Sequence, residues 1–192
     1  MKNILCFEGE WKFNTHKKPE RFDLNSEPIL RMLKEYHKCD AIYRHILTKE
    51  DLKLYIKYFN RNKREWNKID IVYIACHGWF HSISLEGENG NVDLQELADI
   101  AGDFFRDKIV HFSCCKTLAN TSEVEHFKSI TGAKLVCGYK KSVDAMKSAI
   151  ADTALLNELI TSNKPGNIKN IAISKFRKTY KSLLNELDFC AI

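Results

Sequence analysis

Two apolar runs in this sequence each end at side chains that can do chemistry. The run VYIACHGWF (72–80) reaches His77-Gly78, and the run IVHFSCCKT (109–117) reaches Cys114-Cys115. A cysteine thiolate is a nucleophile, and a histidine can carry a proton near neutral pH. A backbone N–H at a strand-to-helix turn can stabilise an oxyanion. If the two segments meet in space, the sequence predicts nucleophilic cysteine chemistry.

The elements around these segments alternate between short apolar runs and longer stretches with helical spacing. Strands are predicted at 4–7, 41–47, 69–75, 108–112 and 133–139. Helices are predicted at 27–38, 49–62, 94–105, 123–131, about 143–161 and about 168–187. The stretch SISLEGENGNVDL after His77 is typical of a hairpin. This alternation indicates an α/β fold with a mostly parallel central sheet and helices on both faces.

A parallel sheet would bring the reactive segments to one edge. Right-handed crossovers place the carboxyl ends of the strands together, and sites form at that edge in open α/β sheets. Four segments follow predicted strands there: FEGEW (7–11), HGWF (77–80), SCCKT (113–117) and YKKSVD (139–144). We therefore expect His77 and Cys115 to be neighbours in space.

Size and composition indicate one globular domain spanning 1–192. The chain is 44% hydrophobic and 29% charged, and no apolar run approaches the roughly 20 residues that cross a bilayer. The amino-terminal run meets Glu8 too early for a secretory signal, and the seven cysteines include no CxxC pair. We expect a cytoplasmic protein with no membrane partner, whose remaining cysteines are small core residues. These are Cys6, Cys39, Cys76, Cys137 and Cys190.

The charge pattern does not favour a nucleic-acid partner. The formal net charge is a mild +5, and the basic residues gather at 61–68 and in the last predicted helix. Such residues are typical of solvated helix ends and faces, so no nucleic-acid interface is predicted.

The order strand, His-Gly, hairpin, helix, strand, Ser-x-Cys, helix, strand resembles the caspase-like superfamily of cysteine peptidases, and most closely its bacterial CHAT-type branch. FSCCKT (112–117) is similar to the branch's Leu-Ser-Ala-Cys-x-Thr segment, with Cys115 on the nucleophile and Cys114 on the Ala. The stretch 132–159 resembles its Gly-Ala-x-x-Val strand, aspartate-containing turn and long helix. The caspase signature Gln-Ala-Cys-x-Gly is absent. The chain also looks like a small, stand-alone family of bacterial proteins.

The resemblance implies a three-layer caspase-like sandwich and a hydrolase that cuts peptide bonds without a metal or other cofactor. Cys115 would attack the scissile carbonyl, and His77 would protonate the leaving amine and then activate water. The N–H groups of Gly78 and Cys115 would form the oxyanion hole. The substrate would be a protein or peptide. We expect no repeat domain or long regulatory extension of the kind that accompanies CHAT-type peptidases, and a regulator could be encoded separately.

The resemblance also implies a preference for a basic P1 residue. Asp144 stands where similar peptidases carry an acid that receives such a side chain, by a charge-assisted bond. Glu8, past the first strand, could add negative potential to that pocket. Ser142 or Asp144 could instead cap the following helix, and Glu8 could lie in a solvated turn.

Other interpretations of the same residues remain open. Cys76, His77, His81 and either Cys114 or Cys115 could ligate zinc, although CxxC and HxxxH spacings are absent. Cys114 and Cys115 could form a strained vicinal disulfide. The domain could also be a catalytically inactive module that binds a peptide or a partner protein.

Overall fold

A six-stranded sheet runs through the centre of the molecule. The computed structural model describes residues 1–11, 25–86, 90–162 and 168–192. The strand order is β2-β1-β3-β7-β8-β9, and every neighbouring pair is parallel except β8 with β9, which is antiparallel. The strands are β1 (Asn3–Glu8), β2 (Ala41–His45), β3 (Ile69–Ala75), β7 (Ile109–Ser113), β8 (Leu135–Tyr139) and β9 (Phe189–Ala191).

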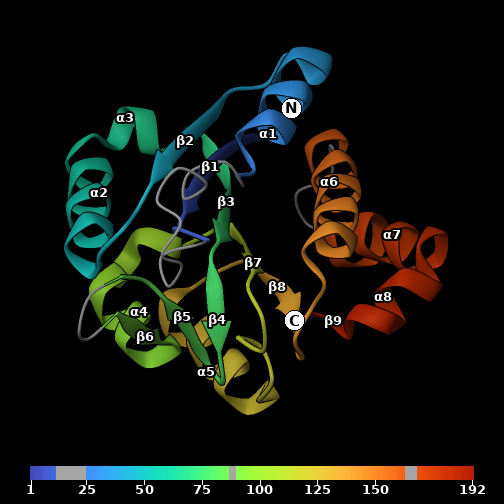
Figure 1. Ribbon diagram of the computed structural model, residues 1–192. Helices are drawn as coiled ribbons and strands as arrows, with labels where there is room; N and C mark the ends of the chain where they lie inside the picture. Colours follow the sequence, from blue (N-terminus) through green and yellow to red (C-terminus); the bar gives the residue numbers. More distant parts are fainter. Residues whose placement is uncertain (12–24, 87–89, 163–167) are drawn as a thin grey trace.

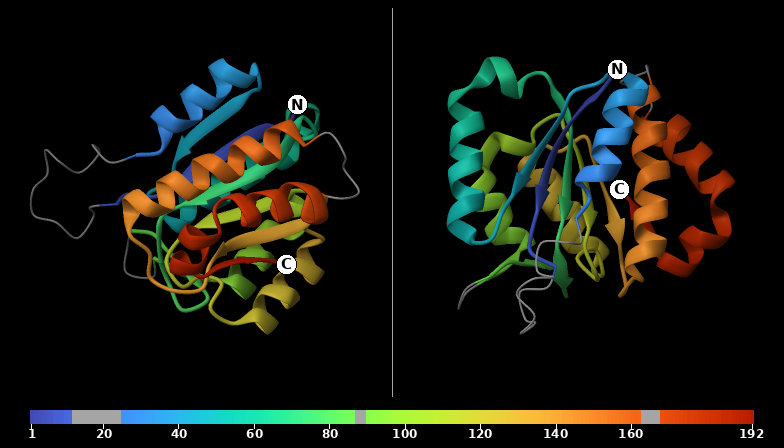
Figure 2. Two further views of the ribbon diagram at one scale, coloured as in Figure 1. Left: turned by 90° about the vertical axis from the view of Figure 1, so that its right-hand side faces the viewer. Right: turned by 45° about the horizontal axis from the view of Figure 1, so that its top comes forward.

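Helices cover both faces of this sheet (Figures 1 and 2). One layer comprises α2 (Lys49–Arg61), α3 (Lys63–Trp66), α4 (Leu94–Ala101) with a 3-10 turn (Gly102–Phe105), and α5 (Thr121–Thr131). The other comprises α1 (Glu27–His37), α6 (Ala145–Thr161), a π-helical turn (Lys169–Ile173), α7 (Ser174–Thr179) and α8 (Lys181–Leu187). The prediction of an α/β fold with a mostly parallel sheet is confirmed.

The two cores are built by alternation along the central strands. In β1, Leu5 and Phe7 pack toward α2–α5, while Ile4 and Cys6 pack toward α1 and α6. Successive side chains of a strand point to opposite faces, so a strand covered on both faces needs a nearly continuous apolar run. That requirement explains why β1 and β3 stand out in the sequence as nearly continuous apolar runs.

Local sequence signals set the starts of several helices. Thr48 caps α2 and forms a capping box with Asp51. Ser26 is the N-cap of α1 but makes no side-chain cap bond; Asn25 accepts a hydrogen bond from the Glu27 amide instead. Asp144 is the N-cap of α6 and accepts from the Lys147 amide.

The segment after β3 forms more than the predicted hairpin. A separate three-stranded antiparallel sheet contains β4 (His77–Trp79), β5 (Ser82–Ser84) and β6 (Asn91–Asp93). His77 therefore begins a strand, whereas the sequence placed it in a loop. The predicted turn falls partly on 87–89, which lie outside the described residues.

The carboxyl-terminal region differs from the prediction of one helix over 168–187. A π-helical turn and two short helices, α7 and α8, replace it, and Phe189–Ala191 adds β9 to the sheet edge. A three-residue strand is too short to produce a periodic signal. Within the described ranges, no helix has the length and apolar character needed to cross a membrane.

A buried polar cluster links α6 to three strands. The Asp152 carboxylate, on α6, accepts hydrogen bonds from Tyr73 Oη on β3 (3.0 Å), Ser113 Oγ on β7 (2.5 Å) and Tyr139 Oη on β8 (2.5 Å). His111 Nε2 lies 2.6 Å from Asp152 Oδ1, and both side chains are fully enclosed. A buried carboxylate requires such partners, because an unsatisfied one would be strongly destabilising.

The pair is held in its charged form. Burial alone would lower the pKa of His111, but the Asp152 carboxylate and Cys137 raise it well above its ordinary value of 6.5. Burial likewise raises the pKa of Asp152, but His111 and the hydroxyls of Ser113 and Tyr139 outweigh it, so the pKa lies below its ordinary 3.8. The result is an interior imidazolium–carboxylate pair.

This pair predicts a defined pH dependence of stability. The folded chain keeps the His111 proton above pH 6.5, where the unfolded chain releases it. The histidine contribution is therefore complete below that pH and is lost as pH rises, with a slope of at most about 1.4 kcal/mol per pH unit. The Asp152 contribution is present above pH 3.8 and is lost on acidification. Urea unfolding from about pH 2 to about pH 9 measures both losses, the acidic one below pH 3.8 and the alkaline one above pH 6.5.

Two variants separate the pair from its surroundings. Asp152→Asn should lower the free energy of unfolding by about 3–5 kcal/mol, because it leaves the buried imidazole without its counter-charge. It should also abolish most of the loss in unfolding free energy that the parent shows above pH 6.5. Tyr73→Phe removes only one hydroxyl donor, so it should cost about 1 kcal/mol and keep the pH dependence. An unchanged alkaline loss in Asp152→Asn would contradict the charged pair.

Candidate functional site

The carboxyl ends of the parallel strands bring the predicted residues to one edge. Glu8, Ala75 and Ser113 are registered across β1, β3 and β7, so the segments that follow these strands emerge side by side. His77 lies two residues beyond Ala75, and Cys115 lies two beyond Ser113. The structure thus places His77 and Cys115 on neighbouring strand ends.

Cys115 differs from the other six cysteines, all of which are buried. It is partly exposed, and its Sγ accepts a hydrogen bond from the Val143 amide at 3.4 Å. The same sulfur lies 3.9 Å from the Val143 carbonyl oxygen, to which the thiol can donate, so the backbone of Val143 holds Cys115 by both of its polar groups. The Val143 amide was not anticipated, because a backbone donor leaves no trace in residue type.

Cys114 has the opposite environment. It is 1% exposed, and its Sγ lies 3.5 Å from Cys76 Sγ in the core between the sheet and α2–α5. Burial, followed by the hydrogen bond with Cys76, raises the pKa of Cys114 well above its ordinary 9.0. Cys114 is thus packed in the core beside Cys115, and the prediction that the five remaining cysteines are core residues is confirmed.

His77 is exposed and is oriented by the turn that follows β1. Its Nε2 lies 2.6 Å from the backbone carbonyl oxygen of Trp11, and the two rings meet edge to face with centroids 5.5 Å apart. A carbonyl oxygen only accepts hydrogen bonds, so Nε2 carries the proton. The neutral ring then has its lone pair on Nδ1.

Gly78 allows the histidine segment to approach the cysteine segment. A Cβ at this position would lie 2.4 Å from the carbonyl oxygen of Cys115 and 2.6 Å from Thr117 Oγ1. The backbone φ of Gly78 is not positive, so close approach is the reason for glycine here. The absence of a side chain at Gly78 therefore lets the backbone of the histidine segment pack directly against the backbone of Cys115.

Thr117 joins the two segments a second time. Its hydroxyl donates to the Ser82 carbonyl at 2.9 Å, and the His81 amide donates to the Lys116 carbonyl at 3.4 Å. Lys116 Nζ lies 4.6 Å from the ring centroid of Trp79 and 4.8 Å from that of Phe80. Both rings are more than half exposed, so an aromatic surface borders Cys115.

The structure separates the two predicted substrate-binding acids. Asp144 is exposed and directly follows Val143, whose amide contacts the Cys115 sulfur. Its capping role is confirmed, and a carboxylate can cap a helix and still accept further bonds. Glu8 is only 1% exposed, and its carboxylate is engaged by Trp11 and Ser26. A substrate cannot reach it, so neither a pocket acid nor a solvated turn describes Glu8.

Neither alternative arrangement of the cysteines is supported by the geometry. In the described part of the chain, no three His, Cys, Asp or Glu side chains are grouped to hold a metal ion. Cys114 Sγ faces Cys76, whereas Cys115 Sγ faces Val143, so the adjacent sulfurs point to different surroundings. A vicinal disulfide would require both to turn.

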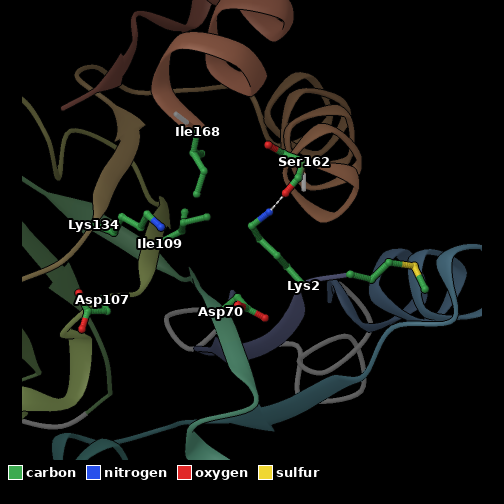
Figure 3. A pocket seen from close by; sticks show the side chains of 8 residues that line it. Lys2, Asp70, Asp107, Ile109, Lys134, Ser162 and Ile168 are labelled. Atoms are coloured by element: carbon green, nitrogen blue, oxygen red, sulfur yellow. Dashed lines mark hydrogen bonds between the residues drawn. The ribbon is translucent and has the colours of Figure 1, made fainter. Parts of the chain in front are cut away.

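A separate hollow lies at the opposite edge of the sheet (Figure 3). It is lined by charges of both signs, including Lys2, Asp70 and Lys134, and the Lys2 ammonium donates to the Ser162 carbonyl. Burial lowers the pKa of Lys2, while Asp70 opposes that effect. This hollow sits at the amino ends of the strands and shares no residue with the cysteine–histidine edge.

The difference between the cysteines predicts selective alkylation. With limiting iodoacetamide near neutral pH, Cys115 in the folded protein should react at least about tenfold faster than any other cysteine, because buried thiols are inert. Peptide mapping by mass spectrometry measures the order of modification. Protein unfolded in urea provides the control, in which all seven should react at similar rates. Early labelling of Cys114 or Cys76 would contradict the described geometry.

Comparison with known proteins gives one result for the whole chain. No curated protein matches the sequence. Residues 1–191 match a family described as a family of unknown function, DUF6642. Because this match spans both the histidine and the cysteine segments and all the described elements, the chain belongs to the DUF6642 family.

Proposed function

We propose that the protein is a cysteine endopeptidase with Cys115 as nucleophile and His77 as proton carrier. One observation carries the proposal: the partly exposed thiol, which accepts a backbone N–H bond, stands on the strand end next to an exposed, oriented imidazole. Acyl transfer by a cysteine requires a nucleophile and a nearby group that carries protons, and these two strand ends place both side by side.

The proposed reaction has two stages. The Cys115 thiolate attacks the scissile carbonyl, and the oxyanion that forms is stabilised by the N–H groups of Gly78 and Cys115. The His77 imidazolium gives its Nδ1 proton to the leaving amine, so the C–N bond breaks and an acyl-thioester remains. Neutral His77 then takes a proton from water, and the water oxygen attacks the thioester carbonyl. The C–S bond breaks, the carboxylic acid product leaves, and the Cys115 thiolate and the His77 imidazolium are restored.

The proposal includes a caspase-like fold. It is supported by the mostly parallel sheet between two helical layers, and by the small antiparallel sheet that follows the histidine. It is also supported by the order of the His-Gly and Ser-Cys-Cys segments, which resembles the CHAT-type branch. The substrate would be a protein or peptide met in a reducing cytoplasm, where free thiols persist. A separately encoded regulator would control access.

Cleavage of a quenched fluorescent peptide library tests the proposal. The parent protein should cleave library members, and Cys115→Ala and His77→Ala should each lower kcat/KM by at least about a thousandfold, because a removed nucleophile or proton carrier leaves little catalysis. Cys114→Ala is the matched control, since it deletes the adjacent sulfur from the core, and it should keep kcat. Equal loss in Cys114→Ala and Cys115→Ala, with the fold intact, would count against a nucleophilic Cys115.

The proposal assigns a basic P1 residue to Asp144. Its carboxylate is exposed beside the amide that contacts the Cys115 sulfur, so a P1 arginine or lysine could form a charge-assisted bond with it.

Substitution of Asp144 tests this assignment without breaking α6. Asn caps helices about as well as Asp, so Asp144→Asn removes the charge and keeps the cap. For P1-Arg peptides it should lower kcat/KM about tenfold or more, the worth of a charge-assisted bond, with little effect on uncharged P1 residues. Acyloxymethyl ketones with P1 Arg, Lys, Leu or Asp report the same preference by labelling Cys115. A preference for P1 Asp would instead point to Lys116 as the selecting charge.

A second function is favoured by the aromatic surface beside Cys115. Trp79 and Phe80 are 56% and 53% exposed, and Lys116 lies over both rings. Such a surface can bind a peptide without cleaving it, and aromatic anchors commonly carry peptide affinity. Under this alternative the domain is an inactive caspase-like binding module. Peptide binding that survives Cys115→Ala but not Trp79→Ala, with no cleavage by the parent, would favour it.

A further inference from the structure

The Glu8 carboxylate at the end of β1 is buried among hydrogen-bond donors. Its Oε1 accepts from Trp11 Nε1 at 2.7 Å, and its Oε2 accepts from Ser26 Oγ at 3.0 Å. The Ser26 amide lies 2.9 Å from both oxygens. Burial and the nearby Glu8 carboxylate also raise the pKa of the Tyr43 hydroxyl. An interior carboxylate of this kind is costly unless its oxygens are satisfied, as they are here.

Trp11 connects this carboxylate to His77. The indole N–H is bound by Glu8, while the backbone carbonyl of the same residue accepts from His77 Nε2. The indole ring also meets the imidazole edge to face. Trp11 therefore contacts the histidine through both its backbone and its side chain, and Glu8 fixes the side chain.

The turn that contains Trp11 is pressed against the histidine segment. A Cβ at Gly9 would lie 2.8 Å from Cys76 Cβ, and the Gly9 amide donates to the Ala75 carbonyl at 2.9 Å. The backbone of 8–11 is thus in contact with the residues just before His77. Loss of the Glu8–Trp11 hydrogen bond would therefore alter the position of the His77 ring.

We infer that Glu8 and Trp11 are positioning residues for His77. By holding the indole, Glu8 fixes the Trp11 carbonyl, and this carbonyl selects the Nε2–H tautomer, which leaves the lone pair on Nδ1. Burying the Glu8 carboxylate costs free energy, and apolar contacts could hold the turn without that cost. A requirement for a fixed position of the His77 ring explains the buried carboxylate better. The catalytic meaning of this inference rests on the proposed peptidase function, but the tautomer does not.

Three variants and a matched control test the inference on the full chain. Trp11→Phe keeps a ring but removes the N–H, and Glu8→Gln removes the charge. Each should lower kcat about tenfold or more with KM nearly unchanged, as loss of an orienting partner does. The double variant should lose no more than Trp11→Phe alone, because Trp11→Phe abolishes the bond that Glu8→Gln weakens. Trp66→Phe, in the opposite core, should reduce stability and leave kcat unchanged.

A second readout does not depend on peptide cleavage. Nitrogen-15 NMR of His77 should show the neutral ring protonated on Nε2 in the parent and in Trp66→Phe, with a new Nδ1–H population in Trp11→Phe and Glu8→Gln. If the parent cleaves no peptide, the proposed function fails while this measurement still decides the positioning role. Should Glu8→Gln not fold, Trp11→Phe alone decides. An unchanged tautomer and kcat in Trp11→Phe, or losses in kcat matched by Trp66→Phe, would overturn the inference.

Discussion

The Asp152 carboxylate is the interaction on which the rest of the structure depends. One side chain of α6 binds groups from three strands: Tyr73 of β3, His111 and Ser113 of β7, and Tyr139 of β8. Hydrophobic packing alone tolerates small slides of a helix across a sheet, whereas a buried carboxylate with four partners is satisfied in one position only. The charge thus sets the register of α6, and with it the turn that leads into that helix.

That register decides how the two adjacent cysteines differ. Along the end of β7, side chains alternate between the faces of the sheet, so Ser113 meets Asp152 on the α6 side and Cys114 enters the opposite core. Cys115 follows at the rim and meets the Val143 amide just before α6. The alternation that buries the Cys114 sulfur leaves the Cys115 sulfur partly exposed. The Val143 amide, just before the helix that Asp152 anchors, donates a hydrogen bond to the Cys115 sulfur.

Sequence alone was sufficient for the elements with strong periodicity and for their shared edge. Strands β1 and β3 are continuous apolar runs, and parallel topology then brings His77 and Cys115 together without any knowledge of side chains. Contacts that depend on where a polar group finds its partner were not predictable. The sequence predicts Glu8 in a turn, whereas the structure buries it. The burial could not be predicted, because one of the two residues that donate hydrogen bonds to its carboxylate, Ser26, is far from Glu8 in the sequence, and the other is Trp11. Asp152 is recognisable in the sequence as a charged residue on the apolar face of α6, between Ala151 and Leu155. The sequence of that helix does not indicate that its partner is His111 on β7.

The candidate site therefore has two independent supports. The cysteine side is fixed from the interior by α6, through a charge shared with β3, β7 and β8. The histidine side is fixed from the end of β1, through a turn that Glu8 holds. These supports come from opposite ends of the sequence, so neither half of the chain could assemble the site alone. The family match covers residues 1–191 and is not confined to the histidine and cysteine segments. This extent agrees with a site whose two supports lie far apart in the sequence.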